Sequence, residues 1–403
     1  MKRYQNIPLI TNTLTQEEAN EAEPSDAATI LNFVISECTD LANNKLPANY
    51  NNMPGGEGNL QRATKGMALA LKSRASLYLA SPLYSADDTQ KWKNAAQAAY
   101  DLINESTTLG YSLDAKYSNL YGATNNQSKE VIMCRPTGAS TSFESANFPM
   151  GVTNGSTTTC PTENLVSAYE MTDGTAFDWS NAEMVENPYA NRDPRLGMTV
   201  VYNGMEWPKT TPVEVFEGGK NGLPIKNATT TGYYLRKYVN NSVTFEPGET
   251  TTSQQHNWIL FRYAEILLNY AEAMVNAYGD PDYAGSYNLS ARDAVNQVRN
   301  RGDVKMPAYP ADMSKDAFLK RLKNERRVEF AFEGQRFWDL RRWKELDDMQ
   351  NIYKVKVVKQ TDGTFQYTKA LHATYNIQDK MYFYPIANTE LFKNHKLVQN
   401  TGW

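Results

Sequence analysis

The chain has 403 residues, and its 41 lysines and arginines are outnumbered by 45 aspartates and glutamates, so its formal net charge is −4. This balance argues against a nucleic-acid-binding protein, whose binding domain is usually strongly basic. The three cysteines, Cys38, Cys134 and Cys160, are too widely spaced to predict a disulfide framework or a zinc knuckle. No segment has the roughly 18 continuous apolar residues of a membrane helix.

The first third of the chain has the apolar periodicity of helices. Ser25 is the predicted N-cap of a helix in which these apolar residues recur at helical spacing: Ile30, Leu31, Val34, Cys38 and Leu41. A glycine-rich turn at residues 54–59 precedes a second predicted helix, residues 60–80, whose small side chains let a neighbouring helix approach closely. With a third helix predicted from Gln90, the pattern is typical of a tetratricopeptide-type unit.

Residues 135–255 have a different amino-acid composition, rich in Gly, Thr, Asn, Ser and Pro. Short strands are predicted at residues 131–134, 198–202 and 233–239, separated by long loops. Loops of this length are uncommon unless they are functional or disordered. The aromatic residues among them argue against disorder, so we expect a functional region.

Helical periodicity returns at Trp258 and continues to Tyr278. Its polar residues step by three and four positions and form one narrow stripe on an otherwise apolar helix: Arg262, Glu265, Asn269, Glu272 and Asn276. Further helices are predicted at residues 290–301 and after an N-cap at Ser314, with Gly334 ending or kinking the last one. The closing residues 381–403 are predicted to hold a short strand and a helical turn.

The segment 325–343, ERRVEFAFEGQRFWDLRRW, concentrates arginines, acids and aromatic residues. A hydrolase could use two of the three glutamates on one helix face as acid and base: Glu325, Glu329 and Glu333. We favour a structural ion-pair network, because nearby arginines can compensate the carboxylates and bind them bidentately. These arginines are Arg326, Arg327 and Arg336, of which Arg336 is predicted to pair with Glu329. The flanking aromatic residues are Phe330, Phe337 and Trp338.

Other patterns of catalysis or metal binding are not found in the sequence. None of the three histidines, His256, His372 and His395, has a second histidine at the spacing of a zinc site. There is no GxSxG nucleophile elbow, and the segment GGKNG at 218–222 is not a phosphate-binding loop. The segment GGEG at 55–58 is interpreted as a turn rather than an anion site. We therefore predict no catalytic residue, no metal site and no cofactor.

Four segments together resemble the SusD/RagB family of nutrient-binding outer-membrane lipoproteins from Bacteroidetes-type bacteria. They are RYQNIPLIT (3–11), KGMALALKSRASLYLASPLYS (65–85), WILFRYAEILLNYAEA (258–273) joined to the segment 325–343, and YFYPIANTELFKNHKLVQNTGW (382–403). They occur in the family's order. Members of this family begin with a lipoprotein signal, an acylated cysteine and further helices, so the resemblance implies an N-terminally truncated member.

The resemblance implies a mainly α fold, a tetratricopeptide-like helical scaffold with a loop-rich region that carries short strands. Residues 1–130 correspond to the helical part and residues 131–403 to the C-terminal part, which is loop-rich at 135–255 and then helical. Together they are expected to form one compact unit. Apolar surface near residues 4–14 is expected to be exposed, because the helices that usually cover it are absent from this chain.

The resemblance also implies a function. Such a protein would bind a glycan at the cell surface, without catalysis, and deliver it to a SusC-like TonB-dependent transporter in the outer membrane. One alternative is a SusD-like binder of peptides. A glycoside hydrolase is a further alternative, from a different class. No nucleic-acid partner is expected.

A glycan site needs aromatic side chains that offer their faces to sugar rings, with a few polar groups beside them. Candidates in the loop-rich middle, outside periodic segments, are Phe143, Phe148, Asn154, Trp179, Tyr202 and Trp207. We favour Trp179 and Trp207, which have polar sequence neighbours, and expect at least one to face solvent. Tyr169 and Tyr233 are assigned to the core, because they lie in periodic segments.

Overall fold

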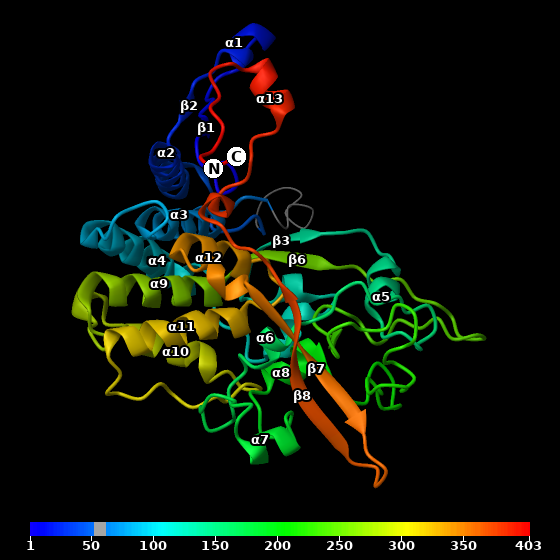
Figure 1. Cartoon of the computed structure of the whole chain (residues 1–403). Helices are drawn as coiled ribbons and strands as arrows, with labels where there is room; N and C mark the ends of the chain where they lie inside the picture. Colours follow the sequence, from blue (N-terminus) through cyan, green and yellow to red (C-terminus); the bar gives the residue numbers. More distant parts are fainter. Residues whose placement is uncertain (52–61) are drawn as a thin grey trace.

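The computed structural model describes residues 1–51 and 62–403, which form a mainly helical protein with small two-stranded antiparallel sheets (Figure 1), confirming the predicted fold class. The helices are α1 (Gln16–Asn20), α2 (Ala27–Asp40), α3 (Lys65–Ala80), α4 (Thr89–Leu109), α5 (Ser142–Asn147), α6 (Glu163–Val166), α7 (Ala182–Glu186), α8 (Arg195–Thr199), α9 (Tyr263–Tyr278), α10 (Ala291–Arg299), α11 (Lys315–Glu329), α12 (Arg336–Trp343) and α13 (Asn388–Lys393). The strands are β1 (Ile7–Pro8), β2 (Pro24–Ser25), β3 (Val131–Pro136), β4 (Val200–Val201), β5 (Tyr234–Leu235), β6 (Asn257–Arg262), β7 (Asn351–Lys359) and β8 (Phe365–Thr374).

The main core lies among stacked helices. Helix α3 packs on α2 and α4, and α9 packs on α4, α10 and α11 (Figure 1). Small side chains at the α3–α4 contact, such as Ala70, Ala96 and Ala99, are fully buried and let the two helices approach closely, as the sequence predicted. A second core, with Tyr169 and Tyr233 fully buried, holds down the loop-rich middle, which confirms their assignment to the core.

Two predicted helix starts in the first third were wrong, one by a single residue and the other by five. The cap of α2 is Asp26, whose carboxylate accepts from the backbone N–H of Thr29 at 2.7 Å, whereas Ser25 lies in β2 and pairs with β1. Helix α3 begins at Lys65, after the cap Thr64, and not at residue 60. The predicted turn at 54–59, with its GGEG segment, lies outside the described residues.

The predicted helix start at Trp258 was also wrong, because Trp258 lies in strand β6. Residues 257–262 pair antiparallel with β3, with Trp258 opposite Arg135. Side chains alternate along the strand: Ile259 and Phe261 are buried, whereas Leu260 is 44% exposed. This period of two is a strand pattern, and hydrogen bonding to β3 outweighs the helical pattern that continues into α9.

The polar stripe on α9 is buried, and each of its central residues has a partner on another helix. Arg74 of α3 binds Glu265 at 2.6 Å, Arg326 of α11 donates to Asn269 at 2.8 Å, and Arg342 of α12 binds Glu272 at 2.7 Å. Buried charges are tolerated when they are paired and hydrogen-bonded. The stripe therefore joins α9 to three neighbours.

The strands of the loop-rich middle are shorter than predicted. In place of strands at 198–202 and 233–239, only β4 and β5 pair, two residues each. A long hairpin that the sequence analysis missed, β7–β8, extends from the body (Figure 1). Most of its side chains are at least partly exposed, but Val355 and Val357, two positions apart on β7, are buried in the second core.

The two ends of the chain lie together in an arm at one end of the molecule (Figure 1). The backbone N–H of Tyr384 donates to the carbonyl of Arg3 at 2.7 Å. Residues of the arm are exposed where predicted, with Tyr4 at 37%, Ile10 at 52% and Leu14 at 36%. The tail has the predicted helical turn in α13, but among the described residues after 381 the predicted strand is not formed.

Helix α11 ends at Glu329, and the chain turns before α12 begins at Arg336. Phe332, with φ of +61°, and Gly334, with φ of +73°, adopt left-handed backbone conformations in this turn. A glycine adopts this region without steric penalty. Gly334 therefore lies in the predicted break, but α11 itself ends five residues before it, at Glu329.

Candidate functional site

The glutamates at the end of α11 are bound by arginines from distant parts of the chain. Three arginines donate to the Glu329 carboxylate: Arg195 at 2.7 Å, Arg262 at 2.6 Å and Arg301 at 2.8 Å. Arg195 and Arg299 bind Glu325 at 2.5 and 2.6 Å. The predicted Glu329–Arg336 pair is wrong, since Arg336 turns outward to Asp348. The compensating charges come from α8, β6, the end of α10 and the turn that follows it, rather than from the same segment.

These contacts favour the structural interpretation of Glu325, Glu329 and Glu333. Glu333 accepts from Arg262 at 2.8 Å and from Lys237 at 2.9 Å. For all three glutamates burial works to raise the pKa, but the paired cations outweigh it and the pKa is lowered. A general acid needs a pKa near the working pH, so these carboxylates are poorly suited to that role.

Two predicted site residues lie in the core. Phe148 is 1% exposed and Trp207 is 3% exposed, and their rings pack edge to face at 5.7 Å. The expectation that Trp207 offers an exposed face is therefore wrong. Its polar sequence neighbours misled the prediction, because the chain folds over the indole and buries it against Phe148.

The structure does not gather the other predicted residues into one site. Trp179 is half-buried, and its indole N–H donates to Glu163 Oε1 at 2.9 Å. Tyr202 stacks on Tyr189, with ring centroids 4.1 Å apart. Tyr189 also contacts Tyr233 and Tyr367, so Tyr202 belongs to an aromatic cluster of its own. Asn154 is exposed at a left-handed turn, with φ of +59°. Phe143 joins a separate set of aromatic side chains.

That set is a continuous row of four rings, which we call the aromatic row: Phe143, Trp258, Tyr238 and Tyr121. Neighbouring ring centroids lie 4.9 to 5.0 Å apart along the row. Phe143, Trp258 and Tyr121 are half-buried, and Tyr238 is 5% exposed. The row joins residues from α5, β6, the 3-10 helix Tyr117–Tyr121 and a loop, which are far apart in the sequence.

The ion pairs anchor one end of the aromatic row. Tyr121 donates its hydroxyl to Glu333 Oε1 at 3.2 Å, and the Lys237 ammonium lies 4.1 Å from the centre of its ring. Burial lowers the pKa of Lys237 to about 8, although Glu333 works in the opposite direction. The scaffold thus fixes the position of Tyr121, and a fixed ring loses little freedom when a ligand binds.

A hollow of about 250 Å³ opens beside this anchored end. Its lining combines aromatic, amide and cationic residues: Ser118, Tyr121, Gly122, Met198, Trp207, Arg236, Lys237, Tyr238, Val239, Asn240 and Asn241. Tyr238 has φ of +68°, a conformation rarely adopted by a bulky residue, and such positions concentrate at functional sites. The aromatic row and this hollow form the candidate site.

Sequence reasoning named Phe143 of this candidate site, and Trp207, which lines the hollow from the core, but it missed Trp258, Tyr238 and Tyr121. Trp258 was assigned to a helix, although the alternation after it is a signal for a strand with one exposed face. The packing of Tyr238 against Trp258 carries no sequence signal. Among the described residues, no group of His, Cys, Asp and Glu side chains is arranged to hold a metal ion.

The helical stack, the loop-rich middle and the small sheets define a mainly helical fold class, and residues 123–403 match the SusD family. Since the match covers more than two thirds of the chain, the chain belongs to this family. A SusD-like protein from Bacteroides fragilis is similar over the whole chain and 76% of its own length, with 27% identity and a TM-score of 0.80.

A second structure from Bacteroides fragilis, a SusD-like carbohydrate binding protein, is 26% identical, with a TM-score of 0.76 over 98% of this chain and 76% of its own. Among curated proteins, a SusD-like protein from Formosa agariphila is 37% identical over 90 residues. That alignment spans 21% of this chain and 16% of the relative. In residues 1–51 and 62–403, no helix is long and apolar enough to cross a membrane.

Proposed function

We propose that this protein binds carbohydrate at the aromatic row and the hollow beside it, without catalysing a reaction. The observation that carries the proposal is the row itself, four rings in contact beside a hollow lined with amide and guanidinium groups. A similar structure is described as a SusD-like carbohydrate binding protein, which supports the same class of ligand.

The chemistry of the site fits a sugar. The C–H faces of a pyranose ring are apolar and pack on aromatic faces, whereas its hydroxyl rim needs hydrogen-bond partners. The half-buried Trp258 and Phe143 supply apolar surface, and Asn240, Asn241 and Arg236 supply donors at the other end of the site. A chain of several sugar units could therefore lie along the row, with one end in the hollow.

We extend the proposal to delivery of the carbohydrate to a SusC-like TonB-dependent transporter at the outer-membrane surface. Membership of the SusD family supports this step. The absence of a catalytic role is supported by the commitment of Glu325, Glu329 and Glu333 to arginine and lysine partners. Prolonged incubation of the purified protein with a bound oligosaccharide is expected to release no shorter product.

The test compares two half-buried tryptophans. A glycan array identifies a ligand, and isothermal titration then compares Trp258→Ala with Trp179→Ala. Truncation of Trp258 is expected to cost about 2 kcal/mol of binding free energy or more, the range of aromatic anchors. Trp179→Ala, outside the site, is expected to bind like the parent. Equal binding by the parent and Trp258→Ala would contradict the proposed site, and hydrolysis of the ligand would contradict the absence of catalysis.

A further inference from the structure

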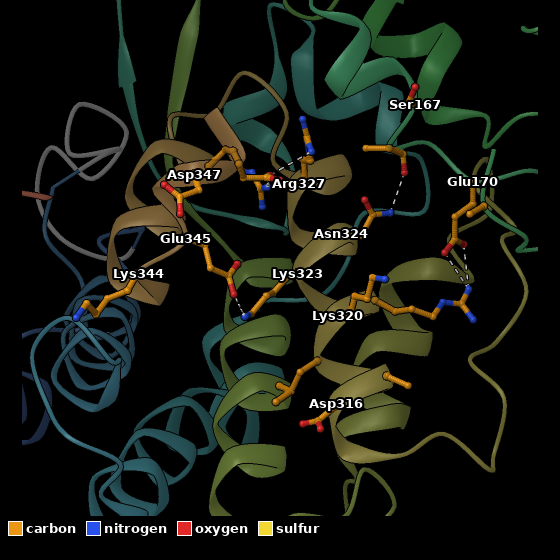
Figure 2. Close-up of a pocket in the computed structure, with 17 residues that line it drawn as sticks. Ser167, Glu170, Asp316, Lys320, Lys323, Asn324, Arg327, Lys344, Glu345 and Asp347 are labelled. Atoms are coloured by element: carbon orange, nitrogen blue, oxygen red, sulfur yellow. Dashed lines mark hydrogen bonds and ion pairs between the residues drawn. The ribbon is translucent and has the colours of Figure 1, made fainter. Parts of the chain in front are cut away.

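A second, larger hollow of about 1000 Å³ lies on another part of the molecule (Figure 2). One wall is a face of α11, and the others are the loop that follows α6 and the chain after α12. The lining residues are Ser167, Ala168, Glu170, Ala176, Asp316, Ala317, Leu319, Lys320, Arg321, Lys323, Asn324, Arg327, Arg336, Lys344, Glu345, Asp347 and Asp348. No aromatic side chain is among these described residues, so the hollow is unlike the aromatic row and is dominated by charge.

Several of its charges are paired within the wall. Arg321 donates to Glu170 at 2.9 Å and to the carbonyl of Gly174 at 3.1 Å, and Lys323 binds Glu345 (Figure 2). These side chains have partners in the protein and do not require a ligand.

Arg327 and Arg336 differ, because they share a single carboxylate. Arg336 binds Asp348 directly, whereas Arg327 Nη1 lies 3.7 Å from the same Asp348 oxygen, beyond hydrogen-bond distance. Within the described residues the Arg327 side chain makes no hydrogen bond, although a guanidinium has five N–H donors. Its side chain is only 20% exposed, whereas Asp348 is 50% exposed. A half-buried cation is thus left with one distant, solvent-facing partner.

The electrostatics of Arg327 agree with this geometry. Burial and the neighbouring Arg336 lower the pKa of Arg327 to about 10, and Asp348 only partly opposes them. Arg327 is therefore still charged at neutral pH, and because its ion-pair partner Asp348 is half exposed and shared with Arg336, full neutralisation is lacking. An anion between the two guanidiniums would supply it, through charge-assisted hydrogen bonds.

We propose that this hollow binds an oxyanion, the carboxylate or sulfate group of an acidic oligosaccharide, between Arg327 and Arg336. The oligosaccharide part rests on the proposed function, whereas the oxyanion part rests on these two arginines alone. Lys320, on the same face of α11 and without an ion pair among the described residues, lies in the hollow (Figure 2) and provides a second cation along the ligand. The protein would then select charged glycans over neutral ones.

The first test uses small probes in low-salt buffer, because salt screens charges at the surface. Sodium sulfate and sodium glucuronate are titrated into the parent protein, with glucose as the neutral control. At least one anion is expected to bind saturably. Arg327→Gln is expected to weaken binding about tenfold or more, as for the loss of hydrogen bonds to a charged group. Asp348→Asn is expected to strengthen it, because this change removes the competing carboxylate.

Arg321→Gln is the matched control. It removes the same charge from the same hollow, but Arg321 is already bonded to Glu170 and Gly174. A specific site predicts little change in this variant, whereas a general attraction of anions predicts the same loss as in Arg327→Gln. Equal losses in the two variants, or no saturable binding of either anion, would overturn the proposal.

The source of the anion is then resolved with a sulfated oligosaccharide, a uronic-acid oligosaccharide and their neutral counterparts. The preferred acidic ligand is expected to bind at least tenfold more tightly than its neutral counterpart, and Arg327→Gln is expected to remove this preference. Trp258→Ala is expected to keep the binding of the small anion. If the anion binds but no oligosaccharide does, the proposed function fails and the oxyanion site stands. If only neutral oligosaccharides bind, the proposed function stands and the oxyanion site fails.

Discussion

Replacing Glu329 by glutamine tests whether the ion pairs at the end of α11 hold the fold together. The carboxylate is fully buried and accepts hydrogen bonds from Arg195, Arg262 and Arg301 at 2.6 to 2.8 Å. Glutamine has nearly the same shape but is neutral, so the three guanidiniums lose a shared negative charge without a large change in volume. Glu329→Gln therefore isolates the electrostatic contribution.

The expected loss of stability depends on which carboxylate partners the arginines keep in Glu329→Gln. Arg195 keeps its ion pairs with Asp193 and Glu325, and Arg262 keeps those with Glu130 and Glu333. These two arginines therefore remain paired with carboxylates. Breaking a buried pair by removing one partner nonetheless costs about 3–5 kcal/mol. We expect a loss in this range in the free energy of unfolding, measured by urea denaturation monitored by tryptophan fluorescence.

The loss is expected to depend on pH in a defined direction. Burial works to raise the pKa of Glu329, but Arg301, Arg262 and Arg195 hold it well below its ordinary value of 4.5. A carboxylate with a lowered pKa in the folded state contributes stability that is complete above pH 4.5 and is lost as the pH falls toward the folded pKa. The difference between the parent and Glu329→Gln is therefore expected to shrink below about pH 5.

The control is Glu37→Gln, which removes the charge of an exposed glutamate on α2. Surface substitutions of this kind usually change stability by less than about 0.5 kcal/mol. A Glu329→Gln protein as stable as the parent at pH 7, or a difference that grows as the pH falls, would refute the ion-pair argument.

Further substitutions test the packing. Gly232→Ala is expected to destabilise the protein by more than about 1 kcal/mol at the contact between the loop-rich middle and the hairpin. Gly232 has φ of +84°, and an added Cβ would lie 2.7 Å from the Val355 carbonyl oxygen. An unchanged unfolding midpoint would show that Gly232 and Val355 are not this close in solution. Trp207→Ala is expected to cost about 3–5 kcal/mol of stability, as for a large buried ring. Trp258→Ala is expected to cost clearly less, because Trp258 is half-buried. A larger fall in melting temperature for Trp258→Ala than for Trp207→Ala would contradict the assignment of Trp207 to the core.

Local signals in the sequence were sufficient for several helices. Ser314 caps α11 as predicted, and Ser290, where the preceding helix was predicted to start, caps α10; both side chains accept from the backbone of the first turn. A capping residue acts on N–H groups two or three positions away, so its effect is visible in a short stretch of sequence. The same holds for the polar stripe of α9, because a helix places residues at three- and four-residue spacing on one face.

The candidate site was predicted only in part, for a physical reason. Trp207 and Trp258 are both tryptophans with polar neighbours in the sequence, yet one lies in the core and the other in the aromatic row. Exposure depends on which distant segment covers a side chain, and in long loops no periodicity indicates that segment. The signal that could have located Trp258 was the alternation that follows it in β6.

The sequence by itself determined several of the longer helices, which of their faces are polar, and that the carboxylates of segment 325–343 need cations. Only the tertiary structure decided which cations those are. Nearby Arg326 and Arg336 bind other acids, and Glu329 is neutralised instead by Arg195, Arg262 and Arg301. Ion pairing depends on distance in space and on desolvation, and in this chain both are set by how α8, α10 and β6 pack around the end of α11.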